Sequence, residues 1–160
     1  MSEDARFEDG REAPLNLGAF DAEDLKVLAS LSQDAVFPAA EMKWLPRERR
    51  FALLINRFRW EDAPRAEARK RPVERVQSVL SVENVLRVAS SGVERGDKDM
   101  ILSLLDIEWA QDGEGPEGDL TLVLAGDGAI RLRLEALELR LRDVTRPYVA
   151  PSKQTPEHPE

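Results

Sequence analysis

The stretch R-F-A-L-L-I-N-R-F-R-W-E, residues 50–61, decides the fold of this chain. Residues 51–55 form an unbroken apolar run, which a strand carries where both of its faces are covered. From Asn56 onward the side chains alternate between two faces, with Asn56, Phe58 and Trp60 on one and Arg57, Arg59 and Glu61 on the other. We therefore predict a central strand that is buried on both sides where it begins and has a wet, arginine-bearing side where it ends.

The composition limits the kinds of site that the chain can build. With 160 residues, of which 42% are apolar, a single domain can bury about two-thirds of its unfolded surface. The chain has no cysteine, which excludes disulfides, thiolate metal sites and a cysteine nucleophile. The only histidine, His158, lies in a proline-rich tail, so a histidine-based triad or zinc site is not expected. We predict no metal and no cofactor, and the missing catalytic residues favour a protein that is not an enzyme.

The charge bears on partners and location. A net charge of -8 repels phosphate backbones, so nucleic acid is not expected as a partner. No apolar segment is long enough to cross a membrane, and residues 1–13 are acidic rather than a secretion signal. We expect a soluble protein of the cytoplasm that does not bind membranes.

The domain organisation follows from shifts in composition. Residues 1–18 are mostly charged and predict a disordered acidic lead, whereas residues 146–160 predict an extended proline-rich tail. Residues 19–145 between them predict a single globular domain. Inside this domain, residues 61–72 lie between prolines and lack apolar anchors, which predicts a mobile loop.

The first regular element is a helix that begins after Phe20. Asp21 can cap this helix, and the negative charges of Glu23 and Asp24 stabilise its first turn. Its apolar stripe ends near residue 33. Pro38 makes the next apolar residues an edge or a lead-in to a strand. Alternation then predicts strands near residues 42–45, 73–82, 85–89, 100–110, 120–124 and 130–134, with hairpin turns at 46–50, 83–84 and 126–128.

Two details of this pattern concern side-chain placement. In the strand at 100–110 we predict that the core face holds Ile101, Leu105, Ile107 and Trp109. If this strand lies beside the central one, Arg57 and Arg59 face Asp106 and Glu108.

The run after Leu134 fits two periods. Leucines at 137 and 141 with Val144 fit a helix, whereas leucines at 137, 139 and 141 alternate as in a strand. Residue preferences favour a closing helix over residues 135–144.

One glycine-rich motif and one group of arginines bear on ligands. Residues 113–118, G-E-G-P-E-G, match a dinucleotide fingerprint, but a strand follows them and two glutamates would repel a pyrophosphate, so we interpret them as a hairpin loop. The basic residues near the central strand can form a surface for a small anionic ligand, with an aromatic ring for stacking; the predicted binding residues are Arg57, Arg59, Trp60, Arg69 and Arg71. The simpler interpretation is solvated charge balanced by neighbouring glutamates.

Several segments together carry a family resemblance: D-A-E-D-L (21–25), Q-D-A-V (33–36), the stretch at 50–61, D-M-I-L-S-L-L-D-I-E-W (99–109) and I-R-L-R-L-E-A-L-E-L-R-L-R-D (130–143). Across residues 17–148 the chain resembles a family of small bacterial proteins known as domain of unknown function 2948. The resemblance implies one compact domain in a bacterial cytoplasm. It implies no activity, cofactor or catalytic residue.

We therefore expect an α+β fold with a mainly antiparallel sheet of about seven strands, bent or two-layered as in pleckstrin-homology-like barrels. An N-terminal helix and a closing helix complete it. The expected function is a non-catalytic binding or scaffolding module, which binds a protein partner or self-associates through an exposed sheet edge. The alternative is a protein or enzyme that binds phosphate-bearing ligands through its arginine-rich loops.

Overall fold

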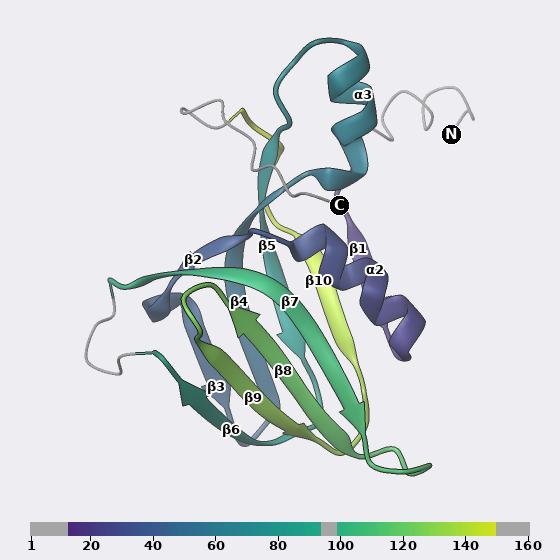
Figure 1. The fold of residues 1–160 in the computed structure, drawn as a ribbon, viewed down its shortest axis with the longest axis vertical. Coiled ribbons are helices and arrows are strands. Elements are labelled where there is room, and N and C mark those ends of the chain that lie inside the picture. The colour runs from purple at the N-terminus through teal and green to yellow at the C-terminus, as the bar shows by residue number, and fades with distance from the viewer. Residues whose placement is uncertain (1–12, 94–98, 150–160) are drawn as a thin grey trace.

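The structure, a computed structural model, describes residues 13–93 and 99–149 (Figure 1). The strands are β1 (Asn16–Ala19), β2 (Val36–Pro38), β3 (Met42–Leu45), β4 (Arg50–Phe58), β5 (Arg75–Val82), β6 (Val85–Ser91), β7 (Ile101–Gln111), β8 (Gly118–Leu124), β9 (Ala129–Leu134) and β10 (Leu139–Asp143). The helices are α2 (Ala22–Ser32) and α3 (Ala63–Ala68), with short 3-10 turns η1 (Ala39–Glu41) and η2 (Trp60–Asp62). The predicted mainly antiparallel sheet is confirmed, but it has 10 strands rather than about seven.

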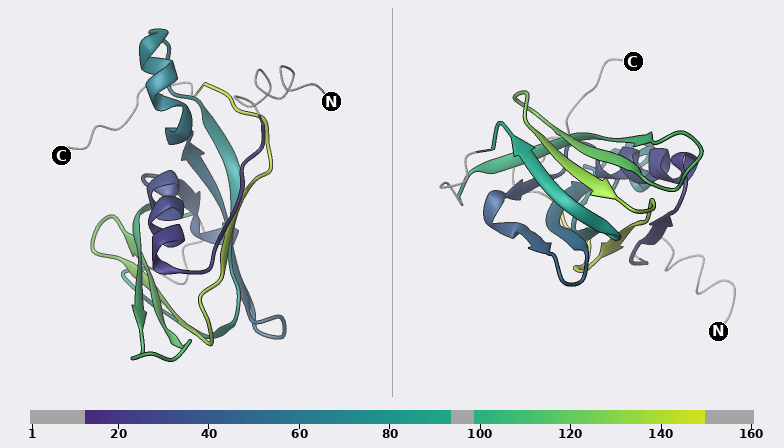
Figure 2. Two further views of the ribbon diagram at one scale, coloured as in Figure 1. Left: turned by 90° about the vertical axis from the view of Figure 1, so that its right-hand side faces the viewer. Right: turned by 90° about the horizontal axis from the view of Figure 1, so that it is seen from below.

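The sheet folds back on itself into two layers. Its strand order is β1-β10-β5-β4-β2-β7-β8-β9-β6, and β3 also pairs with β4. The short strand β2 joins β4 to β7, and Val36 pairs with both Asn56 and Ser103. Figure 2 shows the layer of β7, β8 and β9 facing the layer of β5 and β10, with α2 beside the opening between them. Buried leucines from both layers fill the core, among them Leu53, Leu80, Leu104, Leu122, Leu132 and Leu141.

Strand β4 is long and well paired, as predicted, but it buries a different face. Its inner face runs through Phe51, Leu53 and Ile55 to Arg57, whose exposed fraction is 0%. Leu54, on the opposite face, is only half-buried, so the apolar run is not covered on both sides. The expectation that Arg57 lies on a wet side is therefore wrong. The alternation set by the apolar residues places this arginine in the interior, where it requires partners.

Helix α2 begins as predicted. Asp21 is the N-cap, and its carboxylate accepts a hydrogen bond of 2.8 Å from the backbone N–H of Asp24. Leu25, Leu28 and Ala29 are buried. The helix packs against β1 and β7, so its apolar stripe covers the side where the two layers diverge.

The predicted core face of β7 is wrong in its first half. Ile101 and Leu105 are 64% and 39% exposed, whereas Leu102 and Leu104 are buried. A β-bulge directly after Leu104 shifts the alternation by one residue. From Ile107 onward the predicted face is restored, and this residue is buried.

The closing helix over residues 135–144 is also wrong, because residues 139–143 form strand β10 between β1 and β5. Leu139 and Leu141 are buried, and Arg140 and Arg142 are exposed. Two backbone ladders and two buried leucines outweigh the modest helix preference of the residues. Strand β1 begins at Asn16, inside the segment predicted as a disordered lead; residues 1–12 and 150–160 lie outside the described residues.

Two connections and one strand pairing differ from expectation. Residues 61–72, predicted as a mobile loop, contain η2 and α3. Residues 83–84 are not a hairpin turn, because β5 pairs with β4 and β10 whereas β6 pairs with β9. Asn84, with a φ of 61°, takes the chain from one layer to the other. Strands β4 and β7 are separated by β2, so the predicted facing of Arg57 with Asp106 is wrong.

The glycine motif at 113–118 is a hairpin loop between β7 and β8, as predicted, and it ends in a tight contact. A Cβ atom on Gly118 would lie 2.5 Å from the carbonyl oxygen of Ala110. A Cβ atom on Gly115 would lie 3.7 Å from its nearest neighbour, the carbonyl oxygen of Asp112.

We predict that Gly118→Ala lowers the free energy of unfolding by about 1–3 kcal/mol, because backbone must move to admit the methyl group. Gly115→Ala, in the same motif, should change it by less than about 0.5 kcal/mol. Chemical denaturation of both variants checks this. Equal stability of the two variants would contradict it.

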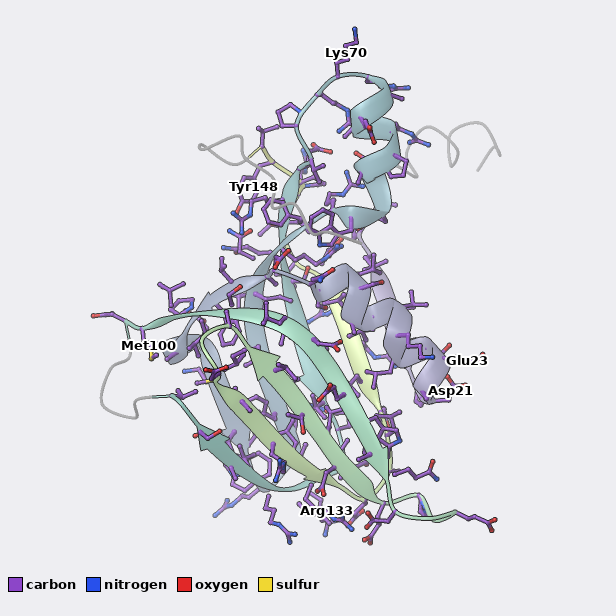
Figure 3. All side chains as sticks on the ribbon, in the orientation of Figure 1. Asp21, Glu23, Lys70, Met100, Arg133 and Tyr148 are labelled. Carbon is purple, nitrogen blue, oxygen red and sulfur yellow. The ribbon has the colours of Figure 1, made fainter. Side chains whose placement is uncertain are left out.

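An ion pair at the same hairpin makes the stability of the fold depend on pH. Hydrogen bonds from Arg133, which lies beside this hairpin at the end of the sheet in Figure 3, hold the pKa of the Asp112 carboxyl below its ordinary value. A lowered folded pKa means that the pair stabilises the fold above the ordinary carboxyl pKa of about 4, and that this contribution disappears as the pH falls through the folded pKa.

We therefore predict that Arg133→Gln raises the pKa of Asp112, measured by NMR titration of its carboxyl carbon. The variant should also lose less stability than the wild-type protein when the pH falls from neutral to acid. An unchanged titration midpoint would show that the ion pair does not form in solution.

Candidate binding surface

Arg57, the first predicted binding residue, lies inside the protein and is fully hydrogen-bonded. Its Nε donates to Ser78 Oγ at 3.0 Å, and its Nη1 donates to the carbonyl of Phe58 at 3.1 Å. Nη1 and Nη2 donate to the two carboxylate oxygens of Glu61, each at 2.9 Å, and Nη2 also donates to Asp143 Oδ1 at 2.9 Å. All five N–H groups of the guanidinium therefore have acceptors within the protein.

These contacts tie several elements together. Asp143, at the end of β10, also accepts the hydroxyl of Ser78 at 2.7 Å and the backbone N–H of Leu15 at 2.9 Å. Burial alone would lower the pKa of Arg57, but hydrogen bonds and charges from Glu61 and Asp143 outweigh burial and raise it. The arginine stays charged and links β4, η2, β5 and β10.

Arg59, Trp60 and Arg71 hold the base of the η2–α3 segment. The buried side chain of Arg59 pairs with Glu74 at 2.7 Å, and Arg71 pairs with Asp62 at 2.6 Å. The indole N–H of Trp60 donates to the carbonyl of Gln33 at 2.9 Å, just after α2. These contacts anchor a segment that otherwise projects away from the sheet (Figure 1).

Arg69 is placed differently, because it lies exposed at the tip of the projecting segment with Arg65 and Lys70. Figure 3 shows Lys70 at the outermost point. None of these three cations forms an ion pair with the described residues. The five predicted residues thus do not share one surface: Arg57 and Arg59 are inside, Trp60 and Arg71 brace the base, and Arg69 lies at the tip.

A different cationic surface lies on the outer side of β3, β4, β5 and β10. We call it the basic sheet face and define it by Lys43, Arg50, Arg140 and Arg142 around a shallow depression of about 430 Å³. Pairing registers place Arg140 beside Ser81, Ser81 beside Ala52, and Ala52 beside Lys43.

Small and apolar side chains form the floor of this face. In one row across four strands, two small side chains separate Arg140 from Lys43 by about 14 Å, three strand spacings. In the next row Arg142 lies beside Val79. The exposed ring of Phe20 lies close to Gly18, which pairs with Arg140. Arginines beside apolar and aromatic groups are typical of protein interfaces.

The charges of the basic sheet face are partly unpaired. Arg50 donates to both carboxylate oxygens of Glu83, at 2.9 and 2.8 Å. Arg140 and Arg142 form no ion pair within residues 13–93 and 99–149. Three arginines and two carboxylates, Glu83 and Glu138, line the depression, so its lining is basic although the chain as a whole carries a charge of -8.

Arg140 and Arg142 are not among the binding residues predicted from sequence, because residue preferences favour a helix at their position. The signal was present, since the leucines at 137, 139 and 141 alternate with Glu138, Arg140 and Arg142. In a strand this alternation places both arginines on one exposed face, about 7 Å apart.

The described residues contain no group of three or more histidine, aspartate or glutamate side chains that could hold a metal ion. None of the helices in this part of the chain has the length and apolar character needed to span a membrane.

A family model described as "Protein of unknown function (DUF2948)" matches residues 15–158. No curated protein and no solved structure matches the chain.

We predict that Arg57→Met lowers the free energy of unfolding by about 3–5 kcal/mol, because Asp143 then remains buried without a cation. Arg69→Met, at the exposed tip, should change stability by less than about 0.5 kcal/mol. Urea denaturation measures both. Adding Asp143→Leu to Arg57→Met should restore part of the lost stability. The prediction fails if Arg57→Met unfolds at the same urea concentration as the wild-type protein.

Proposed function

The chain belongs to the DUF2948 family, whose description names no activity, and we propose from the geometry that it is a non-catalytic binding module for an acidic protein partner. The basic sheet face is the recognition surface. The observation that carries this proposal is the pair Arg140 and Arg142, which are exposed and have no ion-pair partner in the described chain.

The contrast with the interior supports this choice of surface. Arg57 and Arg59 are buried, and their guanidinium groups pair with carboxylates of the same chain. Arg140 and Arg142 keep their donors free for a partner. Guanidinium groups favour carboxylates because two parallel N–H groups match two oxygens.

The shape of the face favours a protein over a small molecule. Its depression is shallow, and its floor contains Ala52, Val79 and Ser81. An apolar floor flanked by arginines matches a partner that presents apolar side chains between carboxylates. The charge of the whole chain keeps other acidic proteins at a distance, so the local basic face also confers specificity.

A second candidate function rests on the tip of the projecting segment. Arg65, Arg69 and Lys70 are exposed there, with only Glu67 as an exposed acidic neighbour in α3. Such a cluster suits a small anionic, phosphate-bearing ligand. Stabilisation by inorganic tripolyphosphate in a thermal-shift assay, lost in Arg65→Gln/Arg69→Gln/Lys70→Gln, would support this alternative.

We also infer a bacterial cytoplasmic setting, from the absence of cysteine and the family resemblance. We propose by analogy that the bent antiparallel sheet, with helix α2 beside its opening, resembles a pleckstrin-homology-like barrel. This is an analogy of fold, and it adds no function.

The test of the main proposal uses a fluorescein-labelled peptide of alternating glutamate and leucine residues. We predict that Arg140→Glu/Arg142→Glu weakens its binding by about tenfold or more at low salt, because charge repulsion replaces attraction. The control is Arg87→Glu/Arg131→Glu, which makes the same charge change at exposed positions on β6 and β9. Fluorescence anisotropy at two salt concentrations measures both.

The control should bind the peptide as the wild-type protein does. Equal loss in the two variants would mean that binding follows net charge, and the proposal would be wrong. Absence of binding by the wild-type protein would also overturn it.

A further inference from the structure

Strand β7 has an edge that is only partly covered. On one side it pairs with β8 along most of its length, from Leu104 to Gln111. On the other side it pairs with β2 from Ile101 to Ser103, and Leu104 exchanges backbone hydrogen bonds with Ala35 and Asp34. No strand within the described ranges pairs with this second side beyond that point. The later half of β7 therefore presents an unpaired backbone edge.

The hydrogen bonds show which backbone groups face this edge. Asp112 N donates to the carbonyl of Glu117, so residue 112 faces β8. Ile107 N donates instead to the side chain of Asp106, at 2.8 Å. Because orientation alternates along an antiparallel strand, the N–H and C=O groups of Ile107, Trp109 and Gln111 point away from β8.

Asp106 has a particular role at this edge. Its carboxylate oxygen accepts the Ile107 N–H from the position that the carbonyl of an added strand would take. A charged side chain on an open edge also prevents unspecific pairing between sheets. The edge is therefore protected by a carboxylate that an incoming strand can replace.

Helix α2 forms the opposite wall of a slot beside this edge. The slot has a volume of about 530 Å³, and its lining includes Leu25, Ala29 and Ser30 of α2 and Leu105 of β7. Leu105 is 39% exposed because the β-bulge turns it out of the core. An apolar surface thus lies directly beside a row of free backbone donors and acceptors.

The geometry points to a single extended peptide segment as the occupant. Helix α2 runs alongside β7, so a second folded copy that approached this edge with its own helix would meet α2, whereas an extended segment carries no helix. Main-chain hydrogen bonds to an open edge supply affinity, and side-chain pockets supply specificity.

The charges of the lining specify the side chains of this peptide. Asp106 and Glu108 line the slot, and Lys26 is its cation. Side chains of an added strand point alternately to the two faces of the sheet. One set would face the core side and contact Leu25 and Trp109, and the other would lie beside Asp106 and Glu108 on the exposed face. We infer that the slot binds an extended segment of a partner protein that alternates apolar and basic residues.

This site is separate from the basic sheet face, and the experiment keeps the two apart. A phage-displayed library of random ten-residue peptides is selected on the full-length protein. Enriched peptides should alternate apolar and basic residues, and a synthetic copy of one should slow amide hydrogen exchange at Trp109 and Gln111. Arg140→Glu/Arg142→Glu should bind it with unchanged affinity.

Two tryptophan variants with the same new side chain test the slot itself. Ser30→Trp fills the slot from an exposed position on α2 and should weaken binding of the peptide by about tenfold or more. Val27→Trp, on the exposed outer side of α2, should bind as the wild-type protein does. If Ser30→Trp does not fold, Gln111→Pro removes an edge N–H instead, at an exposed residue of an open edge where proline is tolerated.

The inference is overturned if no peptide is enriched, if the enriched peptides bind the slot-blocked variant as well as the wild-type protein, or if Trp109 and Gln111 gain no protection. Loss of binding in Arg140→Glu/Arg142→Glu would assign the peptides to the basic sheet face and would likewise overturn the slot.

Discussion

The buried guanidinium of Arg57 is the interaction on which the rest of the structure depends. It has 0% exposure and is bound by Asp143 and Glu61. A buried charge destabilises a fold unless every hydrogen-bonding group is satisfied, and here each N–H has an acceptor. The cluster fixes where β4 ends, where η2 begins and how β10 lies against β5. Because Asp143 also accepts the N–H of Leu15, the same carboxylate positions the entry to β1.

This constraint divides the cations of the protein into two groups. Those near the end of β4 and the base of the η2–α3 segment are paired with carboxylates of the same chain, so they hold a polar segment without an apolar core of its own. Those on the outer side of β10 and at the tip of α3 face solvent. A cation that is fully paired inside stabilises the fold, whereas one that is exposed and unpaired is available to a partner. Sequence proximity to the central strand does not separate the two groups.

The two layers of the sheet also differ in what they offer to a partner. The layer of β1, β10, β5 and β4 offers a face on its outside, whereas the layer of β7, β8, β9 and β6 offers an open edge beside α2. The short strand β2 is the cause of the open edge, because its three residues cover only the beginning of β7. The antiparallel register pairs Pro38 with Ile101 and Val36 with Ser103, so the open edge lies beyond the start of β2, where the chain arrives from α2. The short connection between α2 and β2 thus leaves the later half of β7 unpaired.

The sequence by itself determined the features that depend on near neighbours: the capped start of α2, the β3–β4 and β8–β9 hairpins, the loop at 113–118 and most of the strands. These follow from capping, turn conformation and alternation, which act over a few residues. Tertiary structure decided which face of β4 is buried, whether residues 139–143 form a helix or a strand, and which arginines remain exposed. Each depends on a partner far along the chain, such as Asp143, which lies 86 positions from Arg57. Periodicity cannot distinguish a wet face from an interior one when the buried residue is a charge with distant partners, because the compensating carboxylates are brought to it only by the folded sheet.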